Sequence, residues 1–137
     1  MIEIINVSSN RKSQLIDITS EVDRIVRKIG IEDGFIILYV LHTTAGILIN
    51  EGADPDVQRD ILETLDKLIP RDAEYKHVEG DSDAHIKSTI IGCSIIILIE
   101  NSRLVLGTWQ HIFFYEGDGP RNRKVYMKIV STEILGD

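Results

Sequence analysis

Two long apolar runs constrain the fold of this chain more than any other feature of its sequence. GFIILYVL and SIIILI, at residues 34–41 and 94–99, carry large aliphatic or aromatic side chains at nearly every position. Such continuous runs are typical of strands that are covered on both faces, because a half-exposed strand alternates apolar and polar residues. A chain of 137 residues has few helices with which to cover both faces of a sheet. The runs therefore favour a sheet that also packs against another subunit, with a two-layered sandwich that covers itself as the alternative.

Two helices and six strands account for most of the chain. Residues 19–30, TSEVDRIVRKIG, repeat apolar side chains at helical spacing and end in glycine. Residues 54–70, DPDVQRDILETLDKLIP, add an aspartate cap and a proline at the first helical position. β-branched and aromatic residues predict strands at 2–7, 14–18, 34–42, 88–100, 103–116 and 124–134.

The predicted fold class is α+β, as a single domain that spans residues 1–137. The sheet is expected to be mixed but mainly antiparallel and sandwich-like. Short breaks separate the last three strands, so these should pair as antiparallel neighbours, and the two helices should cover one face of the sheet.

Composition excludes several classes of function. Fifteen basic residues stand against 22 acidic ones, so the net charge of -7 argues against binding nucleic acid. The longest apolar run, 90–99, is half the length of a membrane-spanning helix, and the amino terminus lacks the pattern of a signal peptide. We therefore expect a cytoplasmic protein without a membrane partner. Cys93 lies inside the apolar run and is expected to be buried and inert.

Three of the four histidines lie in two short polar stretches. His42 follows an apolar strand in LHTTAG, and His77 and His85 bracket the acidic segment HVEGDSDAH. Imidazole nitrogens and carboxylate oxygens at this density are typical of a site for a divalent cation. The spacing matches no zinc finger or zincin helix, so a solvated acidic loop remains the alternative, and a lone histidine such as His42 often only hydrogen-bonds backbone.

Four further positions are candidates for binding or catalysis. Glu51 follows the histidine strand and is a candidate general base or hydrogen-bond acceptor for a metal ligand, with Asn50 as an orienting donor. Arg121 and Arg123 follow a Gly-Pro turn, where their guanidinium groups suit phosphate or carboxylate or are simply solvated. Strand alternation places His111 on the aromatic face of its strand, which predicts a packing role.

The order of these motifs resembles the YjbQ family, whose members are also called secondary thiamine-phosphate synthases. The resemblance rests on LHTTAGILINE, DPDVQRDILETLDKLIP, AHIKSTIIG preceded by His77, and LVLGTWQHIFFYEGDGPRNRKV, across residues 35–130. It implies a homotrimer with a site near each subunit boundary. It also implies a polar cluster of His42, His77 and His85, with Glu51, Gln110 and Glu116 as neighbours. Ser82 stands where the family usually has asparagine.

The resemblance implies that a pyrimidine-methyl diphosphate is joined to a thiazole phosphate. We accordingly expect a small phosphorylated ligand and a divalent metal, zinc or magnesium, with Arg121 and Arg123 binding the phosphate. The predicted catalytic residues are His42, His85, Glu51 and Gln110, and the predicted metal ligands are His42, His77 and His85. A histidine-rich centre suits a transition metal better than magnesium, so a metal-dependent hydrolase and a non-catalytic trimeric metal-binding or anion-binding protein remain alternatives.

Overall fold

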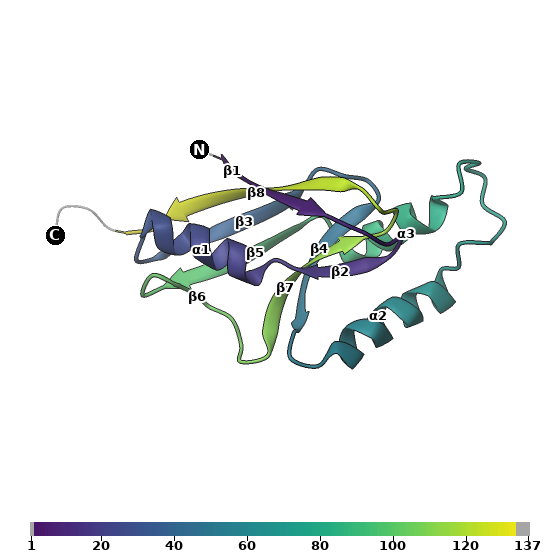
Figure 1. Ribbon diagram of the computed structural model, residues 1–137. Helices are drawn as coiled ribbons and strands as arrows, with labels where there is room; N and C mark the ends of the chain where they lie inside the picture. Colours follow the sequence, from purple (N-terminus) through teal and green to yellow (C-terminus); the bar gives the residue numbers. More distant parts are fainter. Residues whose placement is uncertain (1, 134–137) are drawn as a thin grey trace.

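The computed structural model describes residues 2–133, which form two antiparallel sheets and three helices (Figure 1). The strands are β1 (Ile2–Ser8), β2 (Gln14–Asp17), β3 (Gly34–Val40), β4 (Ala45–Glu51), β5 (Ser94–Glu100), β6 (Arg103–Leu104), β7 (Gln110–Glu116) and β8 (Asn122–Ser131). The helices are α1 (Thr19–Ile29), α2 (Pro55–Leu68) and α3 (Ser82–Ile91). One sheet has the order β1-β8-β3-β5-β6 and the other the order β2-β7-β4. The predicted α+β class is confirmed.

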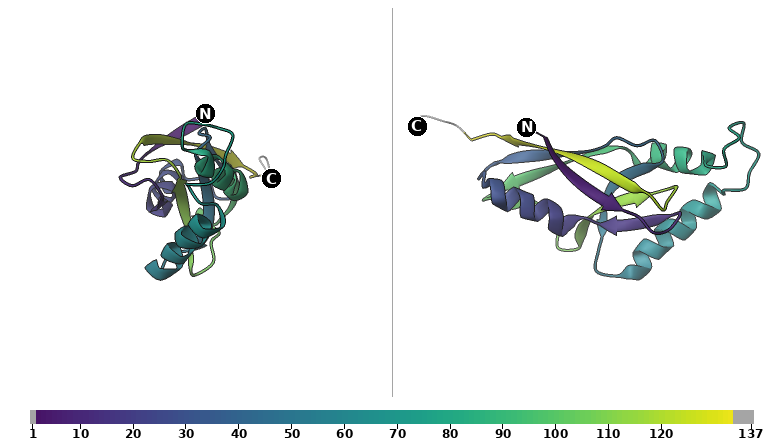
Figure 2. Two further views of the ribbon diagram at one scale, coloured as in Figure 1. Left: turned by 90° about the vertical axis from the view of Figure 1, so that its right-hand side faces the viewer. Right: turned by 45° about the horizontal axis from the view of Figure 1, so that its top comes forward.

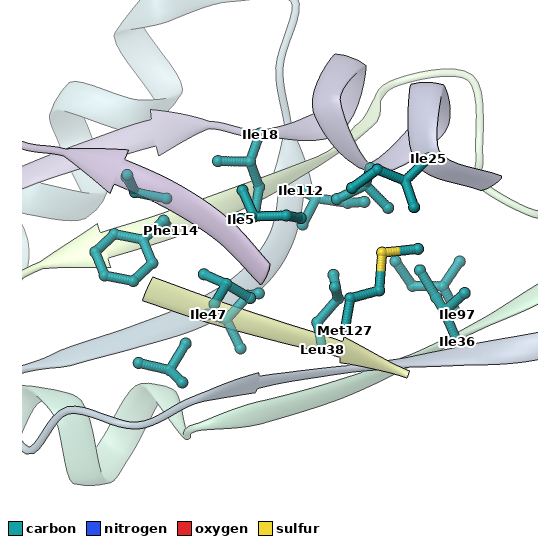
Figure 3. Close-up of a cluster of buried hydrophobic side chains, with 14 of the residues drawn as sticks. Ile5, Ile18, Ile25, Ile36, Leu38, Ile47, Ile97, Ile112, Phe114 and Met127 are labelled. Carbon is teal, nitrogen blue, oxygen red and sulfur yellow. The ribbon is translucent and has the colours of Figure 1, made fainter. Parts of the chain in front are cut away.

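The hydrophobic core lies between the two sheets (Figure 3). Ile36, Leu38 and Met127 contribute to it from the five-stranded sheet, and Ile47 and Phe114 from the three-stranded sheet, and all five are fully buried. Helix α1 extends the layer of the smaller sheet and adds its apolar face to the same core (Figure 1). The sandwich is thus covered on its inner faces by its own elements.

The two predicted helices are confirmed, but only one of them covers a sheet. Helix α1 ends at Gly30, whose φ of 73° lies in the left-handed region. Helix α2 is capped by Asp54, whose side chain accepts a hydrogen bond from the backbone amide of Asp56 at 2.9 Å. None of the α2 residues is buried, and Figure 2 shows this helix on the outside of the molecule. The prediction that both helices cover one face was wrong.

Helix α3 is the largest departure from the sequence prediction, which placed a strand from residue 88 to residue 100. The side of α3 that is buried is mostly polar, and it includes Asp83, Lys87 and Ser88. An apolar periodicity cannot reveal a helix that buries its polar face. Because α3 ends at Ile91 and β5 begins two residues after Gly92, Cys93 lies in the connection. It is exposed rather than buried, contrary to the prediction.

Several strand predictions also require correction. Residues 45–51, where the sequence analysis predicts no strand, form β4, which pairs with β7 in the smaller sheet. The predicted strand at 103–116 is two strands, β6 and β7, which lie in different sheets. Of the predicted pairings among the last three strands, the antiparallel pairing of β5 with β6 is present, but β8 pairs with β1 and β3 rather than with β7. Sheet membership depends on which faces pack together, and short connections do not determine it.

The outer face of the five-stranded sheet remains apolar and exposed. Ile4, Tyr39, Ile96 and Leu98 are each between 44% and 64% exposed, and they lie on β1, β3 and β5 of this sheet. The expected second apolar face is therefore present, and nothing within residues 2–133 covers it. No helix among these residues is both long and apolar enough to cross a membrane.

Candidate metal centre

A cavity of about 450 Å³ brings together most of the predicted site residues. It lies where the end of β3, the start of α3 and the turn between β7 and β8 meet. Its lining includes His42, Thr43, Thr44, His77, Glu79, Asp81, His85, Arg121 and Arg123. His42 and Arg123, which are 81 positions apart in the chain, thus line one cavity together with His77 and His85.

Three of these side chains form a group that fits a metal ion. One nitrogen each from His77 and His85 and one oxygen of Asp81 all lie within 4.8 Å of one another. Nε2 of His77 is 2.9 Å from Asp81 Oδ1, and Nε2 of His85 is 3.4 Å from Asp81 Oδ2. Neighbouring ligand atoms of a tetrahedral zinc ion, with bonds of about 2.0–2.2 Å, lie roughly 3.3–3.6 Å apart. The group therefore needs only small side-chain movements to hold such an ion.

The local fold explains how these three residues meet. Asp81 precedes the first turn of α3, and His85 follows four residues later, so both side chains lie on one face of the helix. His77 lies in the segment between α2 and α3, and its Nε2 contacts the carboxylate of Asp81 four residues later. The two imidazole rings meet edge to face, with centroids 5.4 Å apart and planes at 89°.

The charge state of Asp81 also suits a cation. Desolvation acts to raise the pKa of this carboxyl, but the hydrogen bond from His77 and the charges of both histidines outweigh it. The pKa therefore lies below its usual range, and Asp81 is an anionic ligand at neutral pH.

His42 lines the cavity but does not belong to the metal-binding group, which corrects the predicted ligand set. Its Nε2 accepts a hydrogen bond from the backbone amide of Lys124 at 3.0 Å. Burial lowers the pKa of the imidazole, and the positive charge of Arg123 lowers it further. The neutral ring then carries its proton on Nδ1, which makes it a hydrogen-bond donor with no lone pair left for a metal. The group of atoms that could hold a metal ion thus includes Asp81 and not His42.

The guanidinium of Arg123 is engaged in a buried salt bridge and is not free to bind a ligand. It is 5% exposed and forms a salt bridge with Glu116, which is fully buried. Its Nη2 also donates to Thr44 Oγ1 at 2.8 Å. Burial acts to raise the pKa of the Glu116 carboxyl, but hydrogen bonds from Arg123 and Ser9 outweigh it and hold the pKa below its usual range. The predicted phosphate role of Arg123 is therefore not supported by its contacts.

Arg121 is the arginine that remains available to an anion. Its Nε donates to the carbonyl of Asp118 at 2.8 Å, and its Nη2 donates to the Asp118 carboxylate at 2.7 Å. These contacts hold the guanidinium at the rim of the cavity, where the side chain is 54% exposed. An exposed, charged group held in this way can bind a phosphate at little cost in desolvation.

The structure does not bring Glu51 and Gln110 to the histidines. The β4–β7 pairing places Ala45 opposite Glu116 beside the cavity and Glu51 opposite Gln110 at the far end. Between Ala45 and Glu51 the strand rises about 20 Å, at roughly 3.3 Å per residue. Within one protomer these two predicted catalytic residues therefore lie outside the site. One carboxylate oxygen of Glu51 is buried and has no hydrogen-bond partner within residues 2–133.

His111 lies at that far end as well, in the packing role that was predicted. Its ring stacks on Phe113 with centroids 6.4 Å apart. Its Nδ1 is also 2.5 Å from the carboxylate of Asp17, a contact that the sequence did not reveal because the two residues are 94 positions apart.

A buried network of charges was also missed, and it fixes the orientation of α3. Lys87 and Asp83 are each 1% exposed and are 3.0 Å apart. Lys87 also contacts Asp66 of α2 at 2.6 Å, and Lys12 contacts Asp83 at 3.0 Å. Burial acts to lower the pKa of Lys87, but the two aspartates outweigh it and raise the pKa. Asp83 thus faces away from the metal-binding group, although it lies within the acidic segment.

Comparison with known proteins agrees with this architecture. The family model described as UPF0047 protein YjbQ-like matches residues 3–132. The chain belongs to the YjbQ family. Among its relatives, the UPF0047 protein MJ1081 of Methanocaldococcus jannaschii is 48% identical over 124 residues, which cover 90% of each chain. The UPF0047 protein YugU of Bacillus subtilis is 44% identical over 131 residues, covering 95% of this chain and 99% of the relative.

Solved structures of the YjbQ family share the whole fold. A YjbQ/UPF0047 family protein from Clostridium acetobutylicum has a TM-score of 0.91 and 52% identity, covering 93% of this chain and 99% of that one. A YbjQ-like protein of unknown function from Sulfolobus solfataricus has a TM-score of 0.92 and 34% identity, covering 96% of each chain. These likenesses establish the family and its fold but assign no activity.

The two cavity arginines allow a direct test of their different roles. We expect Arg123→Met to lower the free energy of unfolding by about 3–5 kcal/mol, because it leaves the Glu116 carboxylate buried and unpaired. Arg121→Met removes an exposed pair and should cost less than about 1 kcal/mol. Urea denaturation of both variants measures the difference, and similar losses in the two would contradict the structural role of Arg123.

Proposed function

We propose that this chain is a metal-dependent enzyme that acts on a small phosphorylated molecule. In this proposal His77, Asp81 and His85 bind the ion, and His42 and Arg121 bind the phosphate. The observation that carries it is the single cavity in which the metal-binding group adjoins a hydrogen-bond donor and an exposed guanidinium.

The ligand atoms favour zinc or another transition metal. Two imidazole nitrogens and one carboxylate oxygen suit such an ion, whereas magnesium prefers a shell of oxygens. Three protein ligands also leave a coordination position open, as in catalytic zinc sites and unlike structural sites with four protein ligands. These features support an ion that takes part in chemistry.

The surrounding side chains have clear roles in such a reaction. A bound divalent ion would act as a Lewis acid toward a phosphoryl oxygen and activate water for hydrolysis. His42 would donate its Nδ1 proton to a second phosphoryl oxygen, because its Nε2 is already engaged by the amide of Lys124. Arg121 would compensate the negative charge that develops during the reaction.

Metal binding is the first prediction of this proposal. Purified wild-type protein should contain about one transition metal ion per chain, and His77→Ala or His85→Ala should lose it. His42→Ala should keep the metal but bind inorganic phosphate at least about tenfold more weakly, since it removes only an anion donor. Elemental analysis and isothermal titration calorimetry measure the two effects.

His111→Ala is the matched control, because this histidine lies at the other end of β7. It should change neither the metal content nor phosphate binding. Loss of metal in His42→Ala, with no loss in His85→Ala, would contradict the ligand set.

A thiamine-phosphate synthase is the second candidate function. It is favoured by Arg121 beside the metal-binding group, since departure of diphosphate requires positive charge at the leaving group. The carbon–nitrogen bond would form between the pyrimidine methylene and the thiazole nitrogen, with diphosphate as the leaving group.

Product analysis separates the two candidate reactions. We expect the zinc-loaded protein to release inorganic phosphate from p-nitrophenyl phosphate and to form no thiamine phosphate from a pyrimidine-methyl diphosphate and a thiazole phosphate. His85→Ala should abolish the phosphate release. Formation of thiamine phosphate that is lost in both His85→Ala and Arg121→Met would establish the synthase instead. Tight binding of metal and phosphate without turnover would favour a non-catalytic role.

We also propose that the chain assembles as a homotrimer. The apolar outer face of the five-stranded sheet and the unburied apolar side of α2 support association, because monomeric proteins rarely expose such surfaces. Light scattering should give about three times the 15.5 kDa mass of the chain. Ile96→Glu should dissociate the assembly, whereas Lys28→Glu on α1 should not. A wild-type monomer would exclude the assembly.

A further inference from the structure

A second hollow adjoins the cavity that holds the metal-binding group. It has a volume of about 380 Å³ and lies between the start of β4 and the end of α3. His42, Thr43 and His85 line both spaces, so the two are neighbours along one surface. We refer to the second space, bounded beyond these residues by Ser88, Thr89 and Cys93, as the side hollow.

Small residues create the side hollow. The amide of Ile47 donates to the carbonyl of Gly92 at 3.1 Å, which draws β4 and the end of α3 together. Only glycine fits at position 46, because a Cβ there would lie 2.8 Å from the Gly92 carbonyl oxygen. Gly46 therefore permits this close packing, and Ala45 and Gly92, which line the side hollow, leave room that larger side chains would fill.

The two spaces differ in charge. We refer to the first cavity, which holds the metal-binding group, as the metal-side cavity, and its lining includes Asp81, Glu79 and Arg121. The side hollow, in contrast, is lined by no aspartate, glutamate, lysine or arginine among residues 2–133. A charged ligand group placed in the side hollow would lose water without gaining an ionic partner. The side hollow therefore suits an uncharged group.

Its hydroxyl groups act mainly as acceptors. Ser88 Oγ donates to the carbonyl of Ala84 at 2.7 Å, and Thr89 Oγ1 donates to the carbonyl of His85 at 2.8 Å. Because each hydroxyl has a single proton, only its lone pairs remain for a ligand. A ligand group that donates hydrogen bonds, such as an alcohol, complements this wall.

We infer that the side hollow binds the uncharged, hydroxyl-bearing body of a phosphate monoester, such as a sugar or polyol phosphate. This inference rests on the proposed function, since the phosphate would lie in the metal-side cavity between Arg121 and the ion. His42 and His85, which line both spaces, lie beside the bond between phosphate and body. The side hollow then determines which phosphate esters are accepted.

Cys93 provides a direct measurement, because it is the only cysteine in the chain and its side chain is exposed at the side hollow. The zinc-loaded protein is treated with N-ethylmaleimide while the ester concentration is kept constant by replenishment, so that hydrolysis does not deplete the ligand, and alkylation is followed by mass spectrometry. Ribose 5-phosphate at ten times its dissociation constant should slow alkylation by about tenfold, because a bound ligand shields the thiol in proportion to its occupancy. Inorganic phosphate and free ribose at the same concentrations should have little effect. Arg121→Met should remove the protection by the ester.

A bulky substitution provides an independent test. Cys93→Phe fills the side hollow and should weaken ribose 5-phosphate binding at least about tenfold while leaving inorganic phosphate binding unchanged. Thr108→Phe, an exposed substitution between β6 and β7, is the matched control and should change neither affinity. Circular dichroism confirms that both variants are folded.

The failure of this inference is distinct from the failure of the proposed function. If wild-type protein binds zinc and inorganic phosphate, but ribose 5-phosphate neither protects Cys93 nor binds more weakly to Cys93→Phe, the side hollow is not the subsite. If wild-type protein binds neither zinc nor phosphate, the proposed function is wrong, and the subsite is refuted with it.

Discussion

A buried arginine holds together the segments that surround the candidate site. Arg123 of β8 forms a salt bridge with Glu116 of β7 and a hydrogen bond with Thr44, which precedes β4. Glu116 in turn accepts hydrogen bonds from Ser9 and from the backbone of Asp118. Removing two ions from water costs several kcal/mol per ion, and this arrangement offsets the cost by satisfying the carboxylate on several sides. Four chain segments are thus fixed at one point beneath the cavity.

The two halves of the site depend on different supports. His42 and Arg121 each lie two residues from a member of the Arg123 cluster, so this cluster determines where these two side chains lie. The metal-binding group depends instead on α3, which is held by the buried contact between Lys87 and Asp83. The site forms where these two rigid parts meet. Its geometry therefore depends on polar contacts in the interior as much as on the hydrophobic core.

Whether a helix or site residue could be predicted depended on how far apart in the sequence its stabilising contacts lie. Helix α2 was predictable because its proline and aspartate cap act within one turn. Helix α3 was not, because its buried face is stabilised by Lys12 and Asp66, which are distant in sequence. The approach of His42 to the other histidines was implied by the resemblance to the YjbQ family, because composition alone left a backbone-bonded histidine as an alternative. The backbone amide of Lys124 donates a hydrogen bond to Nε2 of His42, which leaves Nδ1 of this ring as a hydrogen-bond donor. This contact depends on the pairing of strands and could not be predicted from the two stretches.

The sequence by itself determined the α+β class, the two amphipathic helices and the position of His77 and His85 among carboxylates, because local periodicity and residue chemistry express these features directly. Only the tertiary structure decided that Arg123 is buried against Glu116 while Arg121 stays exposed, that the amide of Lys124 engages Nε2 of His42, and that Glu51 and Gln110 lie at the far end of the smaller sheet. Each of these outcomes follows from strand register and from the burial of charged side chains. Both are determined by contacts between residues far apart in the chain, which no local pattern encodes.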